Sequence, residues 1–152
     1  MRAGAVASWL QRLIWGPRGV PGGDRARRDL GARGEREAVR HLRGQGMRVV
    51  ARNVVSRAGE IDLVCVEPGG VVVIVEVKTR IVRAGVRAPR AERSVTSAKR
   101  RKLVRLAGAY ARREGIDRRR IRIDVVAVEF DDGGRATVRH HRRAVTTTPR
   151  RG

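Results

Sequence analysis

Aromatic residues are scarce in this chain of 152 residues, at 3% of the sequence. A hydrophobic core must therefore be built from Val, Leu, Ile and Ala, and the hydrophobic fraction of 41% is large enough to supply one. The scarcity also argues against a dedicated platform for stacking single-stranded bases, which needs aromatic side chains. The length is typical of one domain.

Cysteine and long apolar runs are scarce as well. Cys65 is the single cysteine, so an intramolecular disulfide or a zinc cluster is excluded, and a reducing compartment fits. We expect Cys65 to be a small buried hydrophobe. The apolar run AVASWLQRLIW at 5–15 contains Gln11 and Arg12 and is shorter than the ~20 residues of a spanning helix. It leaves open a weak signal peptide or an amphipathic surface helix; the expectation is a soluble, cytoplasmic protein with no membrane partner.

Acidic residues are few beside the basic ones, 15 against 36, which gives a net charge of +21. A chain this basic is typical of polyanion binding, so we expect nucleic acid as partner, DNA ahead of RNA. Only three of the 36 basic residues are lysines, Lys78, Lys99 and Lys102, and the other 33 are arginines. Genome base composition also favours such an Arg-rich chain, so the charge alone does not decide the partner.

Hydrophobic periodicity and turn residues divide the chain into one domain and two tails. Residues 1–28 end in GPRGVPGGDRARR and are expected to be a flexible basic arm, and residues 142–152 a disordered tail. The domain at 29–141 has helices expected from Asp29, as N-cap, to Gly44 or Gly46 and from Ser97 to Arg113. Strands are expected at 47–53, 59–67, 71–79, 120–130 and 135–141, and a long basic loop at 81–96.

The third strand, VVVIVEVKT at 71–79, is apolar on both faces and should lie in the middle of a covered sheet. The order of the elements predicts an α/β fold, a mixed sheet flanked by helices. Glu76 and Lys78 end this strand on one face, because side chains alternate along a strand. If the turn at 68–70 pairs Glu67 with Val71, Asp62 of the preceding strand lies opposite Glu76.

Two neighbouring carboxylates repel each other, and a divalent cation relieves the repulsion. Mg²⁺ prefers oxygen ligands and takes one or two carboxylates, which Asp62 and Glu76 would supply. Lys78 beside them could hold an attacking water or stabilise charge on a phosphate. Lysine can shift its pKa and acts as a compact charge, whereas arginine does not readily lose its proton. The alternative is a buried ion pair of Lys78 with Glu76 or Asp62, which contributes little stability.

Three further side chains are weaker candidates. Glu35 lies at the apolar edge of the first helix, where it is either part of the site or a first-turn acid favoured by the helix dipole. Lys99, on the apolar face of the second helix, either reaches phosphate or extends outward to solvent. Arg80 is a candidate phosphate contact. Asp124 interrupts an apolar strand and is expected to pair with an arginine, without a catalytic role.

The order of the elements, with Asp62 and the Glu76-Val77-Lys78 triplet, resembles the PD-(D/E)xK nucleases, which have the restriction-endonuclease-like αβββαβ core. More narrowly, the chain resembles the YraN-like family of bacterial proteins, usually described as predicted endonucleases. The resemblance covers about residues 29–141, and Ile61 stands where the superfamily motif has proline. The motifs that carry it are GxxGE at 31–35, RN at 52–53, GEIDLV at 59–64, VEVKTR at 75–80 and IDVVAV at 123–128.

This resemblance implies roles for the matching residues. Asp62 and Glu76 would be ligands of Mg²⁺ or Mn²⁺, with the backbone carbonyl of Val77 as a third, and Lys78 would be the catalytic lysine. Glu35 resembles the helix acid that completes the metal site of archaeal Holliday-junction resolvases. Those resolvases act as dimers, so a homodimer is expected by analogy.

The sequence therefore predicts a metal-dependent endonuclease that hydrolyses the phosphodiester bonds of nucleic acid. DNA is the favoured substrate over RNA, and branched DNA or repair intermediates are included among the candidate substrates. The main alternative is a non-catalytic nucleic-acid-binding module on a nuclease fold, because a fold does not establish an activity. A third interpretation, a basic protein associated with the ribosome or a membrane surface, rests on charge and the N-terminal segment alone.

Overall fold

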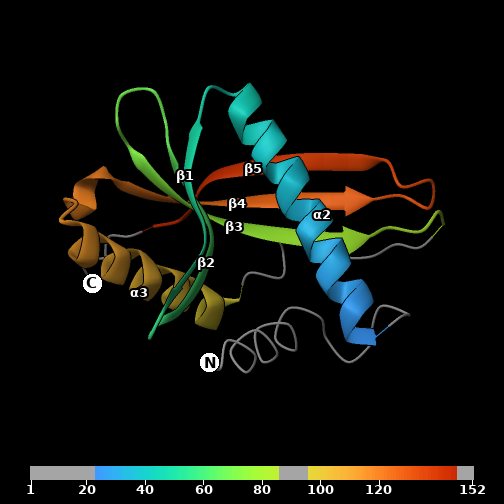
Figure 1. Cartoon of the computed structure of the whole chain (residues 1–152), viewed down its shortest axis with the longest axis horizontal. Helices are drawn as coiled ribbons and strands as arrows, with labels where there is room; N and C mark the ends of the chain where they lie inside the picture. The colour runs from blue at the N-terminus through green and yellow to red at the C-terminus, as the bar shows by residue number, and fades with distance from the viewer. Residues whose placement is uncertain (1–22, 86–95, 147–152) are drawn as a thin grey trace.

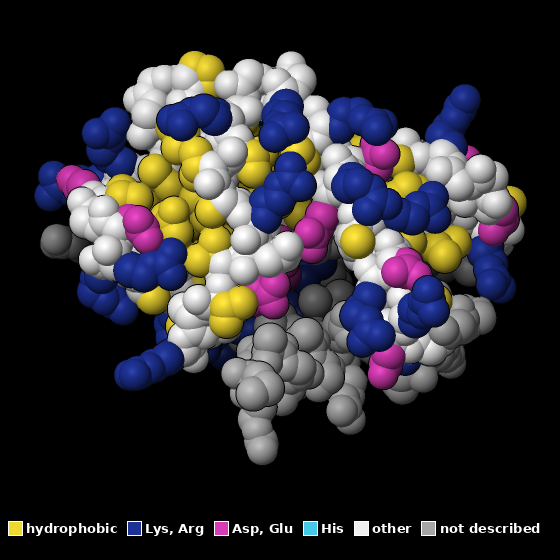
Figure 2. Space-filling view, viewed as in Figure 1, with side chains coloured by type: hydrophobic (Ala, Val, Ile, Leu, Met, Phe, Trp, Pro, Cys, Tyr) yellow, Lys and Arg dark blue, Asp and Glu magenta, His cyan; other side chains and the backbone are white. Residues whose placement is uncertain are grey.

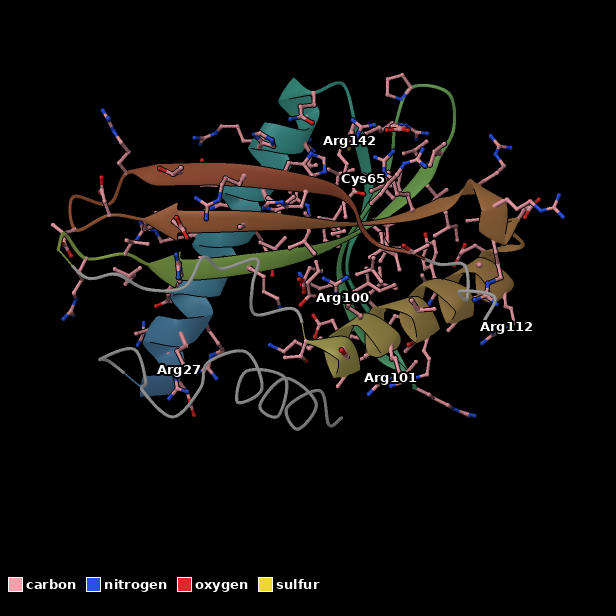
Figure 3. All side chains as sticks on the ribbon, turned by 180° about the vertical axis from the view of Figure 1, so that it is seen from behind. Arg27, Cys65, Arg100, Arg101, Arg112 and Arg142 are labelled. Atoms are coloured by element: carbon pink, nitrogen blue, oxygen red, sulfur yellow. The ribbon has the colours of Figure 1, made fainter. Side chains whose placement is uncertain are left out.

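A five-stranded mixed sheet with one helix on each face forms the part of the chain that the structure, a computed structural model, describes: residues 23–85 and 96–146 (Figure 1). Seen from behind, α3 lies in front of the sheet and α2 behind it (Figure 3). The elements in chain order are α2 (Gly23–Gly44), β1 (Arg48–Ser56), β2 (Gly59–Val66), β3 (Val72–Ile81), α3 (Ser97–Glu114), the 3₁₀ turn η2 (Arg118–Arg120), β4 (Ile121–Phe130) and β5 (Ala136–Val145).

The predicted α/β fold, a restriction-endonuclease-like αβββαβ core, is confirmed. The strands lie in the order β1-β2-β3-β4-β5; β3 pairs antiparallel with β2 and parallel with β4, and α3 forms the crossover between β3 and β4. β3 is the central strand, as its two apolar faces predict. Val73 and Val75 pack in the core under α2, and Ile74 packs in the core under α3. No helix in the described parts of the chain is long and apolar enough to cross a membrane.

Turn residues end the elements where the sequence predicts. Gly69 and Gly70 have positive φ between β2 and β3, where the Gly70 N–H donates to the Glu67 carbonyl (3.0 Å). Gly115 ends α3 in the left-handed conformation with a φ of 65°. Cys65 is fully buried, as expected of a small hydrophobe.

Two predicted element boundaries are wrong. α2 begins at Gly23, so Asp29 lies inside the helix and is not its N-cap; arginine is a good helix former, and Arg27 pairs with Asp24 one turn away (3.5 Å). β5 continues to Val145, which is 5% exposed and pairs with Ile123, so 142–145 belong to the sheet and not to a disordered tail. The remainder of the expected arm (1–22), most of the basic loop (86–95) and the end of the tail (147–152) lie outside the described residues.

Asp124 pairs with an arginine, as expected, within a buried polar cluster on the α2 side of the sheet. Its carboxylate accepts hydrogen bonds from Arg122 Nε (2.8 Å), from the Arg143 backbone N–H (2.9 Å) and lies 2.8 Å from His140 Nε2. Arg122 also donates to Glu67 at the end of β2 (2.8 Å). Burial raises the pKa of Asp124, but the bonds to His140 and Arg122 outweigh it, so the pKa is lower than usual. This charge is thus matched within the fold.

Gly34 brings α2 close to the sheet at the end of β3. It is buried, and a Cβ atom at this position would lie 2.7 Å from the Cβ of Thr79. Real Cβ atoms do not approach so closely, so only glycine permits this spacing between the helix and β3. Gly34 immediately precedes Glu35, and the close approach therefore sets the distance of Glu35 from the strands.

We predict that Gly34→Ala destabilises the protein by about 1–2 kcal/mol, because the cost of overpacking, about 1–3 kcal/mol, exceeds the ~1 kcal/mol that alanine contributes to helix propensity. Gly31→Ala is the matched control: among the described residues, no atom other than those of its chain neighbours and its own helix backbone lies within 4 Å of an added Cβ. It should leave stability unchanged or raise it by up to about 1 kcal/mol. Urea unfolding of both variants measures the difference. Equal stability of the two variants would contradict the tight contact with Thr79.

Candidate active site

The pairing of β2 with β3 has the predicted register. The Glu67 N–H donates to the Val71 carbonyl (3.0 Å), and Leu63 pairs with Val75. The register places Asp62 across from Glu76, on the face of the sheet that α3 covers. The described ladder ends at Leu63, and beyond it the Asp62 carboxylate accepts the backbone N–H of Val77 (2.7 Å). A side chain thus takes the place of the next ladder bond at the point where the two strands separate.

Asp62 is held in a state unfavourable for a charged carboxylate. Burial raises its pKa well above the usual range, and the neighbouring charges of Glu76 and Glu35 raise it further. The Val77 N–H and the charge of Lys78 act in the opposite direction and do not compensate. Positive charge added beside Asp62 would therefore stabilise its ionised form and lower its pKa.

Glu76 and Lys78 form a buried ion pair. The two residues are 9% and 3% exposed, and the Lys78 ammonium donates a hydrogen bond to Glu76 Oε1. The expected alternative of an ion pair at this strand end is therefore correct for Glu76 and Lys78. It does not account for Asp62, which is a second carboxylate beside a pair that is already neutral.

Glu35 lies in the middle of α2, so the interpretation as a first-turn acid is wrong. Burial raises its pKa, a hydrogen bond from Asn53 opposes this, and the charge of Glu60 adds to it. Asn53 has a φ of 49°, a left-handed conformation that asparagine tolerates better than most residues. The hydrogen bond between Asn53 and Glu35 was not predicted from the sequence. Asparagine is one of the few residue types that often adopt a left-handed backbone, so its presence in a strand could have drawn attention to this position.

Helix α3 directs two lysines toward the site. Lys99 is partly exposed, and its pKa is lowered by burial and by the charge of Lys78, which indicates that it lies near Lys78 and Glu76. Lys102 was missed by sequence reasoning. Its pKa is lowered by burial, and it senses the charges of Glu76, Lys78 and Asp62. The signal that could have identified it is the rarity of lysine in this chain.

Figure 2 shows the face of the molecule on which α2 lies. Acidic side chains gather near the centre of the face seen in Figure 2, beside a hollow in which basic atoms are visible. Elsewhere on that face, basic side chains are spread widely over apolar and neutral surface. A phosphate backbone that approaches this face therefore meets mostly positive charge.

Arg80, the other candidate phosphate contact, is held within the sheet. Its Nε donates to Glu129 Oε1 of β4 (2.7 Å), and Arg139 of β5 donates to Glu129 Oε2 (2.9 Å). The hydrogen bond from Arg139, more than that from Arg80, lowers the pKa of Glu129 to about 2 although burial opposes it. Arg80 thus links β3 to β4 and would have to exchange Glu129 for a phosphate.

The donor set fits a hard divalent cation at two carboxylates. Asp62 and Glu76 offer only oxygen atoms, they are neighbours, and their repulsion is the strain that a cation relieves. Within residues 23–85 and 96–146, no three His, Cys, Asp or Glu side chains gather closely enough to hold a metal ion. Glu35 senses Asp62 but is not drawn into one cluster with both carboxylates.

The lowered pKa of Glu129 predicts that part of the protein's stability depends on pH. Its lowered pKa contributes stability above the ordinary value of 4.5 that is lost as the pH falls from 4.5 toward about 2. Glu129→Gln should therefore cost about 2 kcal/mol at pH 7, a figure reduced for partial exposure, and progressively less below pH 4.5. Denaturant unfolding between pH 3 and 7 measures this. Glu114→Gln, which alters an exposed pair with Arg113, should have little effect. A pH-independent cost would contradict the ionic role.

Comparison with known proteins shows the family to which the chain belongs. A model of the uncharacterised protein family UPF0102 matches residues 34–128. A UPF0102 protein of Symbiobacterium thermophilum is 46% identical over 112 residues, 74% of this chain and 92% of its own length. A UPF0102 protein of Sorangium cellulosum is 39% identical over 143 residues, 90% of this chain and 94% of its own length. The resemblance stated from the motifs is thereby confirmed, and the chain belongs to the UPF0102 family, the YraN-like group.

Proposed function

We propose that this protein is a metal-dependent endonuclease that hydrolyses phosphodiester bonds in nucleic acid, DNA before RNA. The observation that carries the proposal is the placement of Asp62 beside the buried Glu76–Lys78 pair, where the β2–β3 ladder ends. Charged groups with perturbed pKa values, such as Asp62, cluster at functional sites. The resemblance to PD-(D/E)xK nucleases supports the same reaction.

Asp62 and Glu76 would hold Mg²⁺ or Mn²⁺, with the Val77 carbonyl as a further ligand and Glu35 completing the set. The N–H and C=O of one residue point to the same side of a strand, so the N–H bond of Val77 to Asp62 supports a carbonyl directed toward β2. When bound, the cation would act as a Lewis acid and lower the pKa of a water molecule. To complete the ligand set, the Glu35 carboxylate on α2 would have to lie closer to Asp62 and Glu76 than it does in this structure.

Lys78 would stabilise charge at the phosphate that is cleaved. Its ammonium is enclosed and already hydrogen-bonded to Glu76, so its position is set before substrate arrives. An ammonium held at such a place offsets negative charge that develops in the transition state, where little water screens it. Glu76 thus serves two purposes, as a proposed metal ligand and as the group that orients Lys78.

Binding would depend mainly on the phosphate backbone. The net charge of +21 gives a strong and salt-sensitive attraction that reads no sequence. We propose, by analogy with resolvases, that the protein acts as a homodimer in the cytoplasm. The alternative function is a binding module without catalysis, for which the same charge would suffice. Magnesium-dependent cleavage decides between the two.

The cleavage prediction concerns duplex, single-strand, flap and four-way-junction DNA and RNA, each with Mg²⁺ or Mn²⁺. The wild type should cleave at least one of them, and EDTA should stop the reaction. Asp62→Asn and Lys78→Ala should each lower the rate by about 10²–10³-fold, the usual cost of one charged group at such a site. Glu114→Gln, far from the site, is the control. Equal cleavage by Lys78→Ala would contradict the assignment of that residue.

A second prediction tests the metal without activity. Mg²⁺ at 100 times its Kd should stabilise the wild type by about 2.7 kcal/mol, because binding to the folded state alone stabilises it. Thermal unfolding should show this shift for the wild type and a smaller one for Asp62→Asn. Without metal, Asp62→Asn should be at least as stable as the wild type, since it removes a repelled carboxylate. Equal shifts in both proteins would exclude Asp62 as a ligand.

A further inference from the structure

All three lysines of this chain lie close enough to Glu76 to interact with its charge. Lysine makes up three of the 36 basic residues. Lys78 comes from β3, and Lys99 and Lys102 from α3, yet each helix lysine senses the charge of Lys78 and of Glu76. Arginine supplies the remaining positive charge of the molecule. A convergence of every lysine on the carboxylates indicates that this place requires an ammonium and not merely a positive charge.

The position of Lys102 explains why a narrow side chain is needed. It lies against Gly59 at the start of β2, where a Cβ atom would stand 2.9 Å from its Cε and 3.2 Å from its Nζ. Gly59 is buried with a φ of 128°, and Leu106 lies on the same side. Lys102 thus passes through a gap that exists because residue 59 has no side chain. A planar guanidinium is wider than an ammonium and fits such a gap less well.

The start of α3 adds positive potential at the same place. The helix begins at Ser97, Thr96 caps it by accepting the Lys99 N–H (3.4 Å), and its first turn contains no acidic residue. The N-terminus of a helix favours negative charge. Lys99 in the first turn and Lys102 one turn later lie on the side of α3 that faces the sheet and are less exposed than their neighbours Arg100 and Arg101.

We propose that Lys99 and Lys102 bind the phosphate that is cleaved, opposite the carboxylates, and that Lys102 is an additional substrate-binding residue of the site. The proposal rests on the proposed function, since it names how the same site holds its substrate. The two ammonium groups contact the non-bridging oxygens of one phosphodiester and place it next to Asp62, Glu76 and Lys78. The alternative is that both lysines only offset the charge of Glu76 and Asp62.

Chemical labelling of the wild type tests the contact without a mutation at the site. Acetylation of Lys99 and Lys102, followed by mass spectrometry, is compared with and without a DNA flap duplex in EDTA, so that no cleavage occurs. Both lysines should react several-fold more slowly with DNA present, and high salt should restore the rate. Arg101→Lys places a reporter on the exposed part of the same helix (Figure 3), and DNA should change its labelling less. Equal labelling of Lys99 and Lys102 with and without DNA would overturn the proposal.

Substitutions give a second measurement. Lys102→Met and Lys99→Met should each reduce the salt dependence of DNA binding by about one unit of slope, and Arg101→Met should do so less. If both lysine variants instead keep the slope and lose only thermal stability, the lysines merely offset the acids and the proposal fails. If the wild type shows the protection and the slopes but cleaves nothing, the endonuclease assignment fails and the phosphate site stands.

Discussion

The repulsion between Asp62 and Glu76 is the constraint on which the rest of the site depends. The register of two strands places the carboxylates together, and the turn between those strands sets the register. A slip by one residue would move Asp62 to the opposite face of the sheet. Lys78 neutralises one carboxylate, and the other remains in a setting that raises its pKa. A cation bound beside Asp62 would therefore relieve the repulsion between the two carboxylates.

Asp124 shows what the fold does with a buried carboxylate that has only a structural role. It lies on the α2 side of the same sheet, fully buried, and Arg122, His140 and a backbone N–H lower its pKa. Asp62 has one backbone N–H, and its pKa is raised. The same residue type on β2 and on β4, the strands on either side of β3, thus has its charge matched in one place and not in the other. Carboxylates with raised pKa values cluster at functional sites, and this contrast is why Asp62 rather than Asp124 is the candidate.

The sequence predicted the parts that depend on local rules. Alternation along β3 and the Pro-Gly-Gly turn were enough for the register, and with it for Asp62, Glu76 and Lys78. The start of α2 was missed because Pro and Gly upstream resemble a linker, whereas the arginines at 25–28 continue the helix. The Asn53 bond to Glu35 and the position of Lys102 against Gly59 are contacts between distant elements. The hydrophobic periodicity of one segment carries no information about contacts with a distant segment, so these contacts could not be predicted from it.

Residue type carries information that net charge does not. Arginine can supply attraction for a polyanion anywhere on this surface, and the chain uses it almost everywhere. Lysine differs in that its charge is compact and can enter a narrow enclosed space. The gap beside Gly59 and the buried pair with Glu76 are two such spaces, and lysine occupies both. In a chain with so strong a preference for arginine, Lys78 and Lys102 therefore mark positions where the shape of the side chain, and not only its charge, is limiting.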